Sequence, residues 1–184
     1  MALPIRERQY SVEEYLALDE HSPERLEYDG GYIYAMPGET GEHNDIVTNL
    51  LLALTPPARA KGCRIRHQNV KLQVSSHKYY YPDLMILCGP RPSDPRIETD
   101  PCLIAEVLSP TTAYRDRGQK LNAYLKLSTL ERYLLISPEE RLVGVYVRSR
   151  EGWLYEPRDS GEIAIPCIEA LLSLEAIYAD LNLE

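Results

Sequence analysis

The chain has 184 residues, of which 44% are hydrophobic, and this is enough for one domain with a substantial core. Asp and Glu total 28 against 20 Lys and Arg, which gives a net charge of −8. Proteins that bind DNA tightly through many phosphates are usually basic, so the acidity argues against tight, sequence-independent DNA binding by the free protein. It does not exclude an enzyme whose metal-binding carboxylates are themselves acidic.

No apolar run approaches the length of a membrane span, and the N-terminal residues lack the layout of a signal peptide. We therefore expect a soluble cytoplasmic protein. The cysteines are widely separated and show no CxxC spacing. Their apolar or β-prone neighbours favour buried free thiols over a zinc site or a disulfide framework, in keeping with a reducing compartment. The cysteines are Cys63, Cys88, Cys102 and Cys167.

The N-terminal third predicts two helices with a hairpin between them. Ser11 can cap a first helix, with Glu14 completing a capping box. Residues 25–36 predict a hairpin that turns at Asp29-Gly30-Gly31. A second helix is expected over 43–54 and should end at Pro56-Pro57. Its predicted inner face is formed by His43, Val47, Leu50, Leu51 and Leu54.

The rest of the chain predicts strands alternating with helices. Residues 63–74 alternate loosely and indicate a strand. Residues 80–88 and 102–108 are nearly continuous apolar runs, typical of strands covered on both sheet faces. The later predicted elements are a helix over 116–127 with Leu121, Tyr124, Leu125 and Ser128 inside, a strand over 132–137, a hairpin over 141–148 and 153–156, and a closing helix over 168–181.

This order predicts an α/β fold in a single domain over residues 1–184. The middle of the chain has the order αβββαβ, which indicates a mixed β-sheet flanked by helices. An N-terminal helix and hairpin precede this core, and a C-terminal hairpin and helix follow it.

Two acids stand where apolar residues are expected. Strand alternation places Asp83 on the face of Met85, and Glu106 on the face of Ile104. Burying an unpaired carboxylate costs several kcal/mol or forces it to take up a proton, so each acid needs a partner. Two acids on adjacent strands could share one hard cation such as Mg²⁺. The alternative is that each sits at a strand end, hydrogen-bonded or paired with an Arg.

These residues resemble the PD-(D/E)xK nuclease superfamily and, more narrowly, the Uma-two family of restriction-endonuclease-like proteins. The resemblance covers almost the whole chain. It rests on residues 26–31 (Leu-Glu-Tyr-Asp-Gly-Gly), His43 opening a helix, residues 81–83 (Tyr-Pro-Asp), residues 106–110 (Glu-Val-Leu-Ser-Pro), and Asp116, Lys120 and Tyr124 spaced four apart. It implies a restriction-endonuclease-like core, a divalent metal, and hydrolysis of phosphodiester bonds, mostly in DNA, with RNA as an alternative.

The chain departs from the superfamily pattern at one position. The superfamily places a Lys two residues after the Glu, where this chain has Leu108. Some superfamily members carry that Lys on the following helix, and Lys120 is the candidate here. Its ammonium group could orient the attacking water and offset charge on the phosphate. The alternative is that Asp116 and Lys120 form an ordinary surface i,i+4 pair of little energetic weight.

The resemblance implies that Mg²⁺ or Mn²⁺ is bound by Asp83, Glu106 and the backbone carbonyl of Val107. Glu27 could supply an additional acid, or it could be an exposed strand residue paired with Arg25. His43 could contact the phosphate or accept a proton, since its ordinary pKa is about 6.5, or it could be a satisfied core residue.

Other features leave several readings open. The best candidates for a phosphate track are the basic residues Arg64, Arg66, His67, Lys71, Lys78, Arg115 and Arg117. Leu108 and the acidity motivate a second hypothesis, a catalytically silent nuclease fold with a binding or regulatory role. A third is a nuclease that depends on an unidentified targeting partner. The hairpin over 141–156 and the apolar residues of 168–178 could bury a homodimer interface, or could cap the monomer core.

Overall fold

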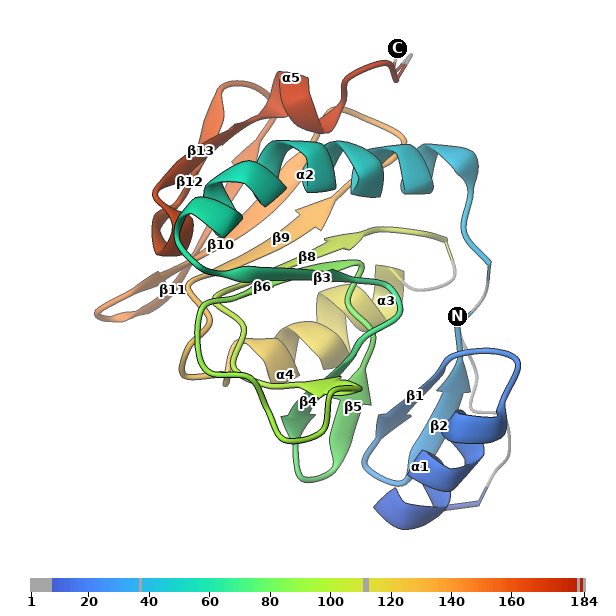
Figure 1. The fold of residues 1–184 in the computed structure, drawn as a ribbon. Coiled ribbons are helices and arrows are strands. Elements are labelled where there is room, and N and C mark those ends of the chain that lie inside the picture. The colour runs from blue at the N-terminus through green and yellow to red at the C-terminus, as the bar shows by residue number, and fades with distance from the viewer. Residues whose placement is uncertain (1–7, 37, 111–112, 182, 184) are drawn as a thin grey trace.

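The structure is a computed structural model that describes residues 8–36, 38–110, 113–181 and 183. Within these residues a central six-stranded sheet has the order β11-β10-β9-β8-β6-β3. Its strands are β3 (Arg64–His67), β6 (Leu84–Leu87), β8 (Leu103–Val107), β9 (Arg132–Ile136), β10 (Val143–Ser149) and β11 (Gly152–Arg158). Helix α2 (Gly41–Ala60) covers one face, and α3 (Ala113–Arg115) with α4 (Leu121–Tyr124) lies across the other (Figure 1).

The predicted order αβββαβ is realised by α2, β3, β6, β8, the α3–α4 segment and β9. Strands β8 and β9 are parallel, as a helical crossover requires, and the other neighbours in this sheet are antiparallel. A second sheet has the order β2-β1-β5-β4-β7. Its strands are β1 (Leu26–Asp29), β2 (Tyr32–Ala35), β4 (Lys71–Ser75), β5 (Lys78–Tyr80) and β7 (Ile97–Glu98).

The single strand predicted over 63–74 is wrong. The segment forms β3 in the central sheet and β4 in the second sheet. Gln68, between the two strands, has a positive φ of 43°, so the backbone turns there and cannot continue one ladder.

The central strands are covered on both faces, as their apolar runs predict. Leu84 and Ile86 of β6 pack into the cluster under α2, whereas Met85 and Leu87 pack into the cluster under α4. Strand β8 alternates in the same way, because successive side chains of a strand point to opposite faces.

The first helix and the hairpin that follows it form as predicted. Helix α1 (Val12–His21) begins with a capping box, in which Ser11 accepts from the Glu14 N–H and Glu14 accepts from the Ser11 N–H. Strands β1 and β2 pair across Gly30 and Gly31, whose φ values of 57° and 102° give the left-handed conformations of a tight hairpin turn.

Helix α2 does not end at Pro56-Pro57 but runs to Ala60. A proline in a helix removes one N–H and crowds the carbonyl four residues earlier. Leu52, which is four residues before Pro56, is 71% exposed, so its side of the helix faces solvent. Leu54 and Ala58 are buried against the sheet, and this packing favours the continued helix.

The closing helix predicted over 168–181 is also wrong. Strand β12 (Glu162–Ile165) pairs with β13 (Ala170–Ser173) after a short turn, η2 (Pro166–Ile168), and only α5 (Leu174–Ile177) is α-helical. Leu171 is 64% exposed and Leu172 is buried, which is the two-residue period of a strand. The predicted apolar stripe otherwise joins the cluster under α2, so it caps the core of the monomer.

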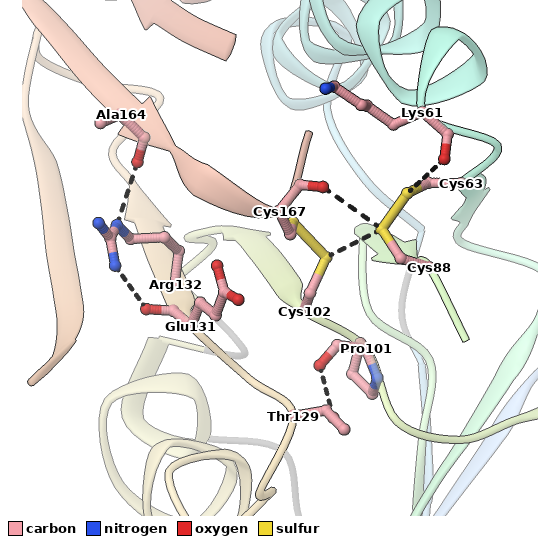
Figure 2. Close-up of a disulfide and its surroundings, with 10 residues drawn as sticks. All are labelled: Lys61, Cys63, Cys88, Pro101, Cys102, Thr129, Glu131, Arg132, Ala164 and Cys167. Atoms are coloured by element: carbon pink, nitrogen blue, oxygen red, sulfur yellow. Dashed lines mark hydrogen bonds between the residues drawn. A yellow bond between two sulfur atoms is a disulfide. The ribbon is translucent and has the colours of Figure 1, made fainter. Parts of the chain in front are cut away.

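The expectation of free thiols from the sequence is wrong as well. Disulfides join Cys63 to Cys88 and Cys102 to Cys167 (Figure 2). The sequence separations of 25 and 65 residues hide this proximity, which arises because neighbouring strands end at one place. The free-thiol argument for a reducing compartment therefore no longer holds. In the described part of the chain, no helix has the length and apolar character to cross a membrane.

Candidate active site at one end of β6 and β8

Asp83 and Glu106 lie side by side at one end of the central sheet. The strand predicted over 80–88 is interrupted, because β5 ends at Tyr80 and β6 begins at Leu84, which leaves Asp83 just before β6. Each carboxylate accepts a backbone N–H from the neighbouring segment: the Asp83 N–H donates to Glu106 Oε2 at 3.2 Å, and the Val107 N–H donates to Asp83 Oδ2 at 2.8 Å. Both carboxylates are buried.

Lys120 reaches these acids from the helical segment. Its Nζ lies 3.1 Å from Glu106 Oε1, 3.0 Å from Glu27 Oε1 and 3.3 Å from Asp116 Oδ1. Lys120 and Asp116 are 3% and 1% exposed, so the alternative of an ordinary surface pair is wrong. The structure thus brings an ammonium group to Glu106 from the helix, while Leu108 packs into the core.

The inner face of this helical segment differs from the prediction. Residues Asp116–Lys120 form a π-helical turn, η1, between α3 and α4. A π turn holds more residues than an α turn and shifts which side chains point inward. Asp116, Lys120, Ala123 and Tyr124 are buried as a result, whereas Ser128, which was expected inside, is exposed.

Glu27 joins the site from the second sheet. It lies on β1, on the face opposite Leu26 and Tyr28, and is 2% exposed. Its carboxylate accepts from Arg115 Nη1 at 2.8 Å and from the Tyr81 N–H at 3.1 Å. The alternative pairing with Arg25 is wrong, because Arg25 donates to the Gln68 carbonyl.

His43 points from the start of α2 toward Asp83. Its Nε2 lies 3.1 Å from Asp83 Oδ2, and because an ionised carboxylate only accepts, Nε2 carries the proton. Burial lowers the pKa of His43, but the hydrogen bond and charge of Asp83, the charge of Glu39 and a backbone contact from Val107 outweigh it and raise the pKa above its ordinary value. His43 is therefore a buried residue whose side chain contacts the Asp83 carboxylate.

The electrostatics of the site are dominated by crowded acids. Burial, together with the charges of Asp116, Asp83 and Glu27, raises the pKa of Glu106 well above its ordinary value despite the opposing charge of Lys120. Burial lowers the pKa of Lys120, but the surrounding carboxylates raise it well above its ordinary value, so the ammonium stays charged. Tyr124 donates to Glu106 Oε1 at 2.8 Å, and burial followed by the Glu106 charge raises its pKa.

The cluster fits a divalent cation in charge and donor type. Its four buried carboxyl groups, on Glu27, Asp83, Glu106 and Asp116, outnumber its two buried cations, Lys120 and Arg115. All the anionic donors are oxygen atoms, the ligand type of Mg²⁺ and Mn²⁺.

Arg115 and the inward position of Asp116 were missed from the sequence. Arg115 was assigned to a phosphate track, and no local signal places it against Glu27, because this contact depends on the π turn and on the approach of the second sheet. For the inward position of Asp116, the available signal in the sequence is its i,i+4 spacing with Lys120 and Tyr124.

The other residues of the predicted phosphate track are mostly paired within the chain. Arg64 and Arg66 both bind Glu98, at 3.0 Å each. Lys71 lies 2.7 Å from Asp19, and Lys78 binds Asp29. The track is therefore not a free basic surface.

Sequence and structure comparisons identify proteins to which this chain is similar. Residues 12–176 match the model of the Uma2 family, described as "Putative restriction endonuclease". Two uncharacterized proteins of Synechocystis sp. are similar to the chain. One, slr1290, is 33% identical over 177 residues, which cover 93% of this chain and 92% of that protein. The other, sll1609, is 34% identical over 127 residues, which cover 67% and 72%.

A crystal structure titled "putative nuclease belonging to DUF820" from Anabaena variabilis matches the fold with a TM-score of 0.77. The match covers 92% of this chain and 98% of that one at 20% identity. At this identity it is the fold that is shared. The expected fold class, a mixed sheet flanked by helices as in restriction-endonuclease-like proteins, is confirmed.

Proposed function

Because the chain belongs to the Uma2 family of restriction-endonuclease-like proteins, we propose that it is a divalent-metal-dependent endonuclease that hydrolyses phosphodiester bonds in DNA. The observation that carries the proposal is the position of Lys120 Nζ, 3.1 Å from Glu106 Oε1, beside the Asp83–Glu106 pair. The lysine missing at Leu108 is supplied from the helix, so the acids and the ammonium group of such a site are all present.

Asp83, Glu106 and the Val107 carbonyl would hold Mg²⁺ or Mn²⁺. When bound, the ion would polarise a phosphate oxygen and lower the pKa of a water molecule. Lys120, fixed by three carboxylates, would orient the attacking water and offset charge on the phosphate. His43 donates to Asp83 through Nε2, which fixes that carboxylate and leaves Nδ1 as the ring atom able to bind a further proton. Glu27 holds Lys120 and Arg115 in place from the second sheet.

The test is cleavage of supercoiled plasmid and of single- and double-stranded oligonucleotides, both DNA and RNA, with Mg²⁺ or Mn²⁺. The wild type should cut DNA with either metal and lose activity in chelator. Asp83→Asn and Lys120→Met should each lose at least about a hundredfold in rate. Glu98→Gln is the matched control, because Glu98 is a buried, cation-paired acid outside the site. Metal-dependent cleavage that survives Asp83→Asn would refute the mechanism.

The paired basic residues favour a second candidate, a catalytically silent module that binds or regulates. In a chain with a net charge of −8, Arg64 and Arg66 bind Glu98 and are not free to contact phosphates. Under this candidate, the wild type would bind no Mn²⁺ in calorimetry and cut no substrate.

A nuclease that depends on a targeting partner, or on a homodimer in which two sites face one duplex, is a further form of the first proposal. Sedimentation of the purified chain tests the dimer. Cleavage that appears only when a DNA-binding partner is added would support the targeting form.

A further inference from the structure

The cysteines form a second cluster of metal-ligating side chains, away from the acids. Cys63 precedes β3, Cys88 follows β6 and Cys102 precedes β8, so all three lie at one end of neighbouring strands. Cys167 reaches the same place from η2, as Figure 2 shows. Four sulfur atoms from four separate segments thus meet at one end of the sheet.

This cluster lies at the opposite end of β6 and β8 from the acids. Asp83 comes just before β6 and Cys88 just after it, and five residues of extended chain span about 17 Å. Cys102 and Glu106 have the same relation on β8. The two sites therefore share strands but no ligands.

The distances between sulfur atoms fit a tetrahedral ion. Zinc binds thiolate sulfur at about 2.3 Å, and a tetrahedron's edge is about 1.6 times its centre-to-corner distance, so bound sulfurs lie about 3.8 Å apart. Cys88 Sγ and Cys102 Sγ, which belong to different disulfides, lie 3.7 Å apart. The sulfurs of Cys88, Cys102 and Cys167 all lie within 4.8 Å of one another, and Cys63 is bonded to Cys88.

We propose that these four cysteines bind one Zn²⁺ when the two disulfides are reduced. A dithiol reductant gives two electrons and two protons to each disulfide and is itself oxidised to a disulfide. A phosphine gives two electrons and becomes a phosphine oxide with the oxygen of a water molecule, whose two protons complete the two thiols. Zn²⁺ then replaces the four thiol protons and forms a Cys₄ site, which is the closed ligand set of structural zinc. Each formerly bonded pair opens to about 3.8 Å by side-chain rotation. Cys88 is exposed, which gives the ion a path from solvent.

Sulfur ligands also separate this site chemically from the acid cluster. Thiolates select soft or borderline ions such as zinc, whereas carboxylates and carbonyls suit Mg²⁺ and Mn²⁺. The ion would pin the α2–β3 corner, the ends of β6 and β8, and the C-terminal hairpin to one point. Its role would be structural, since four protein ligands leave no position for a substrate.

The experiment titrates metal-free protein, reduced with a phosphine, with Zn²⁺ against a chromophoric chelator and with Co²⁺ as a spectroscopic probe. We expect one ion per chain and, for Co²⁺, sulfur charge-transfer absorption with the visible bands of tetrahedral coordination. Zn²⁺ should also protect all four thiols from alkylation, read by mass spectrometry. Cys102→Ser should weaken Zn²⁺ binding roughly a hundredfold or more.

Two controls keep the result specific. Asp83→Ala with Glu106→Ala should leave the sulfur absorption unchanged, which excludes the acid cluster as its source. Cys102→Ser should retain its circular dichroism, which excludes misfolding. Alkylation that proceeds equally with and without Zn²⁺, or Co²⁺ binding without sulfur absorption, would overturn the proposal and leave the cysteines as disulfides only.

Discussion

Replacing Lys120 by Met should destabilise the metal-free protein by about 3–5 kcal/mol. Lys120 is 3% exposed and contacts three carboxylates at 3.0–3.3 Å. Methionine has a similar length but no charge, so the change leaves buried acids without their shared cation, and breaking a buried pair in this way costs about 3–5 kcal/mol. In a chain of this size, that loss corresponds to a fall of about 6–20 °C in Tm.

The assay is urea unfolding followed by circular dichroism, with and without Mn²⁺. Lys126→Met is the matched control, because Lys126 lies in the turn that follows α4 and is exposed, and it should change stability by no more than about 0.5 kcal/mol. Mn²⁺ should restore part of the stability lost in Lys120→Met, since a cation at the acids replaces missing positive charge. A loss below about 1 kcal/mol for Lys120→Met would refute the view that this ammonium group holds the acids together.

Three further predictions test the electrostatics and the fold. The pKa of Glu106 is higher in the folded chain than in the unfolded chain, so its contribution to stability is full below about pH 4.3 and is lost as pH rises through the folded value. Glu106→Gln should therefore flatten the fall in unfolding free energy as the pH rises above about 4.3; an unchanged slope in urea melts would contradict this. Pro56→Ala should raise stability by about 1–2 kcal/mol, because the helix regains one N–H; thermal melts showing a decrease would argue against a helix through this position. Leu171→Asp should cost no more than about 0.5 kcal/mol and Leu172→Asp about 3 kcal/mol or more, since only Leu172 is buried; equal losses in urea titrations would contradict strand β13.

The elements that could be predicted are those encoded by adjacent residues. The capping box at Ser11 and Glu14 and the turn at Gly30-Gly31 are local signals, and both elements form where expected. The acids Asp83 and Glu106 could be paired because two apolar runs with one misplaced carboxylate each predict neighbouring buried strands, and β6 and β8 are neighbours.

The elements that could not be predicted depend on contacts distant in sequence. Pro56-Pro57 carries a local signal to stop a helix, and packing of Ala58 against the sheet overrides it. The disulfides could not be predicted for the same reason, since Cys102 and Cys167 approach each other only after β8 and η2 are in place. The contact of Arg115 with Glu27 depends on the π-helical turn and on the approach of the second sheet, which no local pattern in the sequence reveals.

The charge of the site bears on how an acidic chain could act on a nucleic acid. Its four buried carboxyl groups outnumber its two buried cations, so we expect an incoming phosphate to be repelled until a divalent cation binds among the acids. Basic residues such as Arg64 and Lys71 are already bound to Glu98 and Asp19, so they are not free to offset that repulsion. Under the proposed function, metal and substrate therefore strengthen each other's binding, because each relieves a charge imbalance that the other leaves. An acidic chain is therefore compatible with nuclease activity under the proposed function, because a bound cation offsets the negative charge that the phosphate meets at the site.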